Sequence, residues 1–147
     1  MMVTYTVAEM LSALKERQFQ NFRFFEKQAV VNIVDEQTHI EVIFQSFGEV
    51  ISTDFLDTAV NVLEQLDDCV KKAYGWLDMC ADPENPDAFE NGFEINGLFF
   101  GDIICGTGTH QNGFMVSFEA ADYYPLNFSV KFLGHNMQPV AVEQWVL

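Results

Sequence analysis

Basic residues are scarce in this sequence and unevenly placed. The chain has 7 lysines and arginines against 22 aspartates and glutamates, which gives a formal net charge of -15 at pH 7. No basic residue lies between Lys72 and Lys131, whereas residues 1–27 hold nearly equal numbers of both signs. A field of this sign repels nucleic acid and anionic membranes and attracts basic surfaces. We therefore expect a basic protein partner, and we expect neither nucleic acid nor a membrane to be bound.

Long apolar runs and closely spaced cysteines are missing as well. No run approaches the ~20 apolar residues that span a bilayer, and the N-terminus lacks the basic and apolar segments of a secretory signal. Cys69, Cys80 and Cys105 are an odd number without a C-x-x-C pair, which is typical of buried thiols in a reducing compartment. We expect a cytoplasmic protein.

Hydrophobic residues are plentiful, so the charge does not indicate disorder. They make up 49% of the 147 residues, and 15 residues are phenylalanine, enough for a real core. Thr6 and Glu9 have the spacing of a capping box and predict a short helix to about Gln18. Alternating apolar residues then predict a hairpin that begins near Phe22 and ends at Gly48, with a polar turn at 35–38.

The second predicted helix is long and amphipathic. Asp54 is its expected N-cap, and apolar residues recur at spacings of three and four from Leu56 to Cys80. Such a stripe fits a coiled coil or a helix lying across a sheet. Further apolar residues at positions 60, 62 and 74 favour the helix on a sheet.

The remainder of the chain, from Phe89 onward, is predicted to form strands. Asn96-Gly97 lies between two apolar runs and predicts a two-residue hairpin turn. Strands are expected near 98–105, 114–120, 127–133 and 139–146. The predicted fold is α+β in one domain, 1–147: an antiparallel sheet of about six to seven strands, one long amphipathic helix packed on one face, and a short N-terminal helix.

No motif in the sequence assigns a catalytic residue, a cofactor or a metal. The glycine-rich stretch 106–113 lacks the spacing of a dinucleotide or phosphate loop. Cys105, His110 and His135 could form a zinc site or a Cys–His pair, but they lack the short ligand spacings that such sites usually show. The acidic stretch 82–92 lacks the ligand spacing of a calcium loop.

The strongest functional signal is a group of acidic and aromatic residues without nearby basic residues. Acidic rims around aromatic side chains suit the binding of a cationic protein surface, because charge steers encounter and aromatics supply contact area. The predicted partner-binding residues are Asp78, Asp82, Glu84, Asp87, Glu90, Glu94, Tyr123 and Tyr124.

The order of the predicted elements, with the size and charge of the chain, resembles that of small acidic α+β proteins of bacteria, some of which are toxin-immunity proteins. The stripe of 53–80 and the sequence Gly113–Glu119 with its following strands carry this resemblance. It implies a protein that neutralises a toxin domain by binding it, and it transfers no residue role.

These observations favour a non-enzymatic binding domain, most concretely an immunity protein or inhibitor of a basic partner such as a nuclease toxin domain. Two alternatives stay open. One is a small-ligand-binding protein or enzyme with a pocket between helix and sheet, with His110 or His135 at its mouth. The other is an assembly module that forms a homodimer through the 56–80 stripe or the C-terminal strand.

Overall fold

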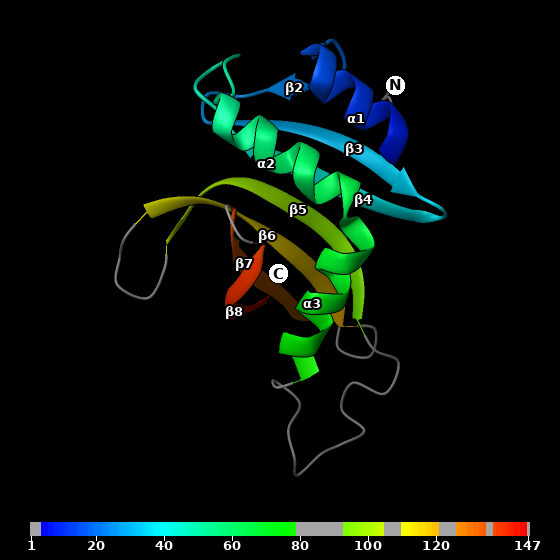
Figure 1. Cartoon of the computed structure of the whole chain (residues 1–147), viewed down its shortest axis with the longest axis vertical. Helices are drawn as coiled ribbons and strands as arrows, with labels where there is room; N and C mark the ends of the chain where they lie inside the picture. The colour runs from blue at the N-terminus through cyan, green and yellow to red at the C-terminus, as the bar shows by residue number, and fades with distance from the viewer. Residues whose placement is uncertain (1–3, 79–92, 105–109, 121–125, 135–136, 147) are drawn as a thin grey trace.

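The computed structural model describes residues 4–78, 93–104, 110–120, 126–134 and 137–146. Within these ranges the strands form one open sheet, accompanied by three helices (Figure 1). The elements are β1 (Thr4–Thr6), α1 (Val7–Glu16), β2 (Arg23–Phe24), β3 (Gln28–Asp35), β4 (Thr38–Gln45), α2 (Thr53–Glu64), α3 (Leu66–Asp78), β5 (Phe93–Ile104), β6 (His110–Ala120), β7 (Leu126–Leu133) and β8 (Gln138–Val146). The predicted α+β class is confirmed.

The sheet is mixed, with eight strands in the order β1-β3-β4-β5-β6-β7-β8 and β2 paired to β3. The pairs β1·β3 and β4·β5 are parallel, and the other pairs are antiparallel. The prediction of an antiparallel sheet of six to seven strands is therefore wrong in these two pairings. The connection from β4 to β5 contains α2 and α3, and a crossover of that length returns the chain in the parallel direction.

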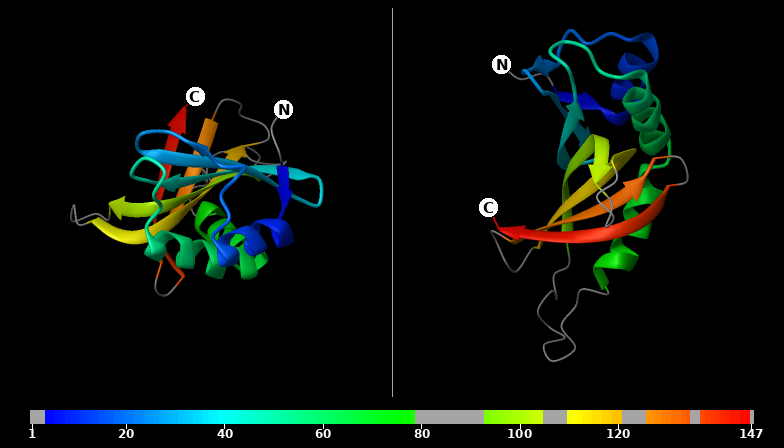
Figure 2. Two further views of the ribbon diagram at one scale, coloured as in Figure 1. Left: turned by 90° about the horizontal axis from the view of Figure 1, so that it is seen from above. Right: turned by 90° about the vertical axis from the view of Figure 1, so that its left-hand side faces the viewer.

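The three helices cover one face of the sheet, as Figures 1 and 2 show, and the hydrophobic core lies between the two layers. Alternate residues of the strands point into this core. A row of phenylalanines runs from the loop before β2 across four strands, β4 to β7. Phe22 lies beside Phe44, Phe44 beside Phe100, Phe100 beside Phe114, and Phe114 beside Phe132, with ring centroids 5.9, 5.3, 6.1 and 4.5 Å apart.

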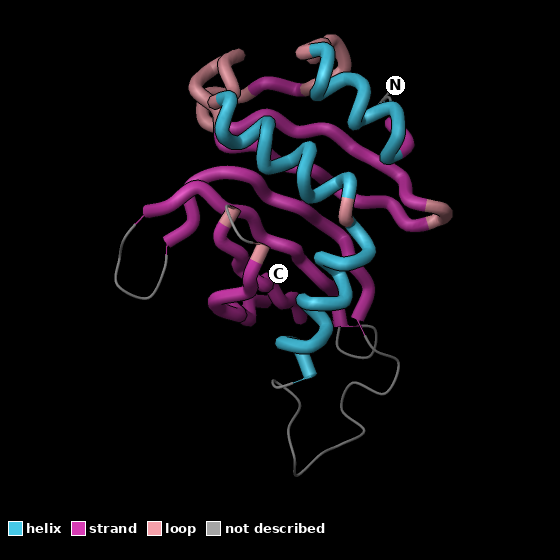
Figure 3. The backbone as a smooth tube through the Cα atoms, in the orientation of Figure 1, coloured by secondary structure: helices cyan, strands magenta, loops and turns pink. Residues whose placement is uncertain are grey.

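The predicted long helix is two helices. α2 ends at Glu64 and α3 begins at Leu66, and Gln65 between them has φ -130° and ψ 31°, outside the helical region (Figure 3). The apolar stripe continues through the break, with Leu63 and Leu66 both buried. Because α2 packs on β5 and β6 while α3 packs on β7 and β8, the break lets a single stripe follow a twisted sheet. Leu56, Ala59, Leu63, Leu66, Ala73 and Leu77 of this stripe are buried in the core.

Two predictions of local structure also change. The N-cap of α2 is Ser52, two residues before the expected Asp54, and the helix begins at Thr53. Asn96 and Gly97 do not form a turn but lie inside β5, where the register shifts between Ile95 and Gly97 as in a β-bulge. The pairing of β5 with β4 on one side and β6 on the other overrides the local turn preference of the dipeptide.

Other local predictions are confirmed. Thr6 caps α1: its Oγ1 accepts from the Glu9 amide at 3.1 Å, and the Glu9 carboxylate accepts from the Thr6 amide at 2.9 Å. Hydrogen bonding of the Glu9 carboxylate to the backbone and then to the side chain of Thr6 lowers the pKa of Glu9. β3 and β4 form the predicted hairpin, with Asp35 opposite Thr38. Among the described helices, none combines the length and the apolar character that crossing a membrane requires.

Candidate functional site

Most of the predicted partner-binding residues lie outside the described residues: Asp82, Glu84, Asp87, Glu90, Tyr123 and Tyr124. Asp78 is the last residue of α3. Glu94 is exposed on β5, directly opposite Glu119 of β6. The structure therefore pairs one predicted residue with a glutamate that is distant in the sequence.

The helix-free face of the sheet carries a row of matched residues that crosses five strands. Glu41 of β4 is in register with Gly97 of β5, which is in register with Ser117 of β6. Ser117 is opposite Ser129 of β7, and Ser129 is opposite Glu143 of β8. The row thus has a glutamate at each end and only small residues between, and we call it the trough.

A cavity of about 340 Å³ lies over this trough. All five residues of the row line it. In a flat sheet, β4 and β8 would be about 19 Å apart at ~4.8 Å per strand, so residues of both strands share one cavity only because the sheet curls. Small side chains in the centre leave the space open. A Cβ at Gly97 would meet the Glu41 carbonyl oxygen at 3.5 Å and Ser117 Cβ at 3.6 Å. Both distances are ordinary van der Waals contacts, so the backbone at Gly97 has room for the methyl group of an alanine.

One side of the trough is apolar. The next row along the strands contains Ile43, Phe99 and Met115, which also line the cavity and are half-buried. The Phe99 ring lies close over Gly101, since a Cβ at Gly101 would come within 2.9 Å of Phe99 Cζ. Glycine at this position therefore leaves room for the Phe99 ring beside the cavity.

The other side of the trough is acidic and polar. Glu94, Glu119 and Asn127 form the row there. Asn96, the residue at the bulge, also lines the cavity, and its Nδ2 donates to Asn127 Oδ1 at 3.0 Å. Asn127 is fully buried. The bulge therefore directs an amide toward the site, which is a common role of bulges.

Two contacts hold the floor and one end of the trough. Ser117 Oγ and Ser129 Oγ are hydrogen-bonded at 3.0 Å. Lys131 Nζ lies 2.6 Å from Glu143 Oε1 and donates to the Ile104 carbonyl at 3.3 Å. Glu143 is therefore neutralised locally, whereas Glu41, at the other end, is exposed and forms none of the ion pairs of the described residues.

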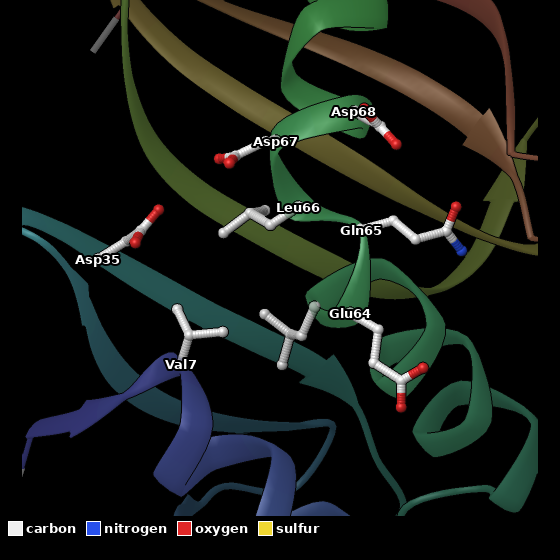
Figure 4. Close-up of a pocket in the computed structure, with 8 residues that line it drawn as sticks. Val7, Asp35, Glu64, Gln65, Leu66, Asp67 and Asp68 are labelled. Carbon is white, nitrogen blue, oxygen red and sulfur yellow. The ribbon is translucent and has the colours of Figure 1, made fainter.

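A second acidic hollow lies at the junction of α2 and α3, with a volume of about 380 Å³. Asp35 of β3 and Asp67 of α3 stand on facing sides of it, and Asp68 points away from Asp35 (Figure 4). Glu64 also lines the hollow but is bound to Lys15 at 3.0 Å. This hollow adds to the negative surface, but it has no aromatic wall like that of the trough.

One alternative from the sequence was a small-ligand-binding protein or enzyme with a pocket between helix and sheet. In that region the described residues form a packed core. A polar hollow of about 290 Å³ occurs at its margin, where α2 meets β6. Asn112 Nδ2 donates there to Thr58 Oγ1 at 3.1 Å. Within the described ranges no three metal-ligating side chains are grouped as a metal site. Of the zinc and Cys–His candidates, His110 lies on β6, while Cys105 and His135 lie outside the described residues.

Two titratable groups on α3 are perturbed by their surroundings. Burial raises the pKa of the Cys69 thiol to about 11, with a further rise from Asp68 and an opposing effect of Lys72. Burial and then the Glu94 carboxylate raise the pKa of Tyr74, whose hydroxyl donates to the Phe93 carbonyl at 2.8 Å. Cys69 is therefore a protonated core residue and not a nucleophile.

The trough was not predicted from the sequence, because it depends on register across five strands. Ser117 and Ser129 alternate with buried apolar neighbours and could have marked a polar face. The interpretation of Asn96-Gly97 as a turn concealed the role of Gly97. In comparisons with protein-family profiles, curated proteins and solved structures, no match to this chain was found.

Proposed function

We propose that this protein is a non-enzymatic binding domain that captures a basic protein through the helix-free face of its sheet. The observation that carries the proposal is the pair Glu94 and Glu119, which stand directly opposite each other on antiparallel strands beside the trough. Like charges directly opposite each other destabilise a sheet. A cationic group placed between them would relieve the repulsion, so the arrangement suits a bound state better than the free one.

The charge of the same face supports this proposal. Strands β4 to β8 carry four glutamates on it, Glu41, Glu94, Glu119 and Glu143, and a single lysine, Lys131, which is bound to Glu143. A concave surface of one sign raises the local concentration of opposite charge and speeds association.

The resemblance to immunity proteins suggests a toxin domain of the nuclease type as the first partner to test. Nucleases that bind a phosphate backbone present a basic groove, and an acidic concave face would occupy that groove. Inhibition would then be competitive with nucleic acid and would weaken as salt screens the charges.

The test compares capture by two variants of equal net charge. The face variant carries Glu41→Gln, Glu94→Gln and Glu119→Gln. The control variant carries Glu16→Gln, Glu36→Gln and Glu49→Gln, three exposed residues outside the helix-free rows of β4 to β8. Each immobilised protein is exposed to lysate of the native host and eluted with a salt step.

We expect wild type and control to release the same basic protein at moderate salt and the face variant to retain little of it. Equal capture by all three proteins would contradict the assignment to this face. Absence of any basic protein would contradict the proposed function itself.

A further inference from the structure

We infer that the trough is the recognition site for one arginine or lysine side chain of the basic partner, so this inference rests on the proposed function and makes it more specific. A long cationic side chain consists of an apolar stem and a charged end. The cavity over the trough offers both environments side by side.

The stem would lie on the small residues of the row and against the apolar wall. Gly97 and Ser117 leave a floor without bulky side chains, and Phe99 and Met115 stand beside it. Aromatic and thioether groups pack well against methylene stems, and an aromatic face also attracts a cation. The volume of about 340 Å³ leaves room for one such side chain together with its adjoining backbone.

The charged end would bind at Glu41. This carboxylate lines the cavity and is absent from the ion pairs of the described residues. Glu143, at the opposite end, is held by Lys131 at 2.6 Å, so a ligand cation would have to displace a lysine to bind there. A guanidinium can form two parallel hydrogen bonds to a carboxylate, so arginine should bind more tightly than lysine.

The serine pair and the bulge contribute acceptors nearby. Ser117 Oγ shares one hydrogen bond with Ser129 Oγ, and the oxygen of a hydroxyl has two acceptor lone pairs. Asn96 lines the cavity from the acidic side. A guanidinium has five N–H groups, so acceptors that line the same cavity as the Glu41 carboxylate favour it over a neutral group of the same shape.

The experiment titrates the isotopically labelled full chain with N-acetyl-arginine amide and follows the amide NMR signals. N-acetyl-citrulline amide, which is isosteric but neutral, and N-acetyl-lysine amide are the matched probes. The protein variants are Glu41→Gln, Gly97→Leu, whose side chain would fill the trough, and Glu36→Gln as a control of equal charge in the β3–β4 turn.

We expect saturable shifts at Gly97, Ser117 and Ser129 with the arginine probe, weaker ones with lysine and none with citrulline. Glu41→Gln should weaken binding at least fivefold and Gly97→Leu should abolish it, whereas Glu36→Gln should leave it unchanged. Equal losses in Glu41→Gln and Glu36→Gln, or shifts spread over the whole surface, would show attraction by net charge alone and overturn the inference.

The two proposals fail in different ways. If the arginine probe does not bind the trough while a basic protein is still captured, the inference is wrong and the proposed function stands. If the probe binds the trough and no basic protein is captured, the trough serves a small cationic molecule, and both the proposed function and the assignment to a partner side chain are wrong.

Discussion

The ion pair between Lys131 and Glu143 should show a strong asymmetry when each partner is removed. The lysine side chain is only 12% exposed, whereas that of Glu143 is 55% exposed. Glu143→Ala would leave a largely buried ammonium with only the Ile104 carbonyl at 3.3 Å. Breaking a fully buried pair costs ~3–5 kcal/mol. Since one partner here is half-exposed, we expect a loss of about 2 kcal/mol in the free energy of unfolding.

Removal of the lysine should cost far less. Lys131→Met replaces the buried charge by an apolar chain of similar length, and the exposed Glu143 regains water, so we expect a change within ~1 kcal/mol. The control is Glu64→Ala, which breaks the surface pair with Lys15, where the two side chains are 56% and 45% exposed. That pair should contribute less than ~1 kcal/mol.

Urea unfolding followed by circular dichroism measures all three differences, provided the slope with denaturant stays constant. The reasoning is refuted if Glu143→Ala costs no more than Glu64→Ala. It is equally refuted if Lys131→Met costs as much as Glu143→Ala. That result would show that burial of the lysine charge carries no desolvation cost for Glu143 to offset.

Three further outcomes can be checked by the same unfolding assay. Phe114→Ala removes a fully buried ring from the aromatic row and should lower the free energy of unfolding by ~3–5 kcal/mol. Phe47→Ala, at an 88% exposed position, should change it by less than ~0.5 kcal/mol. Similar losses in the two variants would contradict the described core. Gly113→Ala should destabilise by about 1–3 kcal/mol, because a Cβ there would collide with the Phe132 carbonyl oxygen; an unaffected midpoint would show that the strands are not so close. Stability should fall as pH rises from about 9 to about 11, because the folded state holds the Cys69 proton, with a pKa of about 11, more tightly than the unfolded chain does. The Cys69→Ala variant should show a smaller fall in stability over this pH range. An unchanged fall would exclude the thiol as its cause.

The fold was predictable where signals are local. The capping box of Thr6 and Glu9 and the hairpin turn at 35–38 depend on residues a few positions apart, and both appear as predicted. The Gln65 break was not predictable, because apolar spacing is continuous across it and the twist of the sheet decides it. The parallel β4·β5 pair was missed for a related reason: periodicity along a strand carries no information about the direction of its neighbour.

The candidate site was harder to predict than the fold, because it depends on residues that are distant in the sequence. Net charge pointed to a basic partner, and Glu94 was among the predicted residues. Glu41 and Glu119 were not, because only the register brings them beside Gly97 and Glu94. The residue that leaves the cavity open, Gly97, was assigned to a turn, since Asn-Gly is a strong hairpin signal and a bulge inside a long strand is the rarer outcome.

The most direct test of the central claim is the rate of association with the captured basic partner, measured over a range of ionic strength. For wild type and the Glu16, Glu36 and Glu49 control variant, we predict fast association at low salt and a steep decline as salt is added. The Glu41, Glu94 and Glu119 variant should associate at least tenfold more slowly at low salt, with a shallower decline. Identical rates for the two variants would show that binding depends on total charge or another surface, and would contradict the assignment of partner binding to the helix-free face.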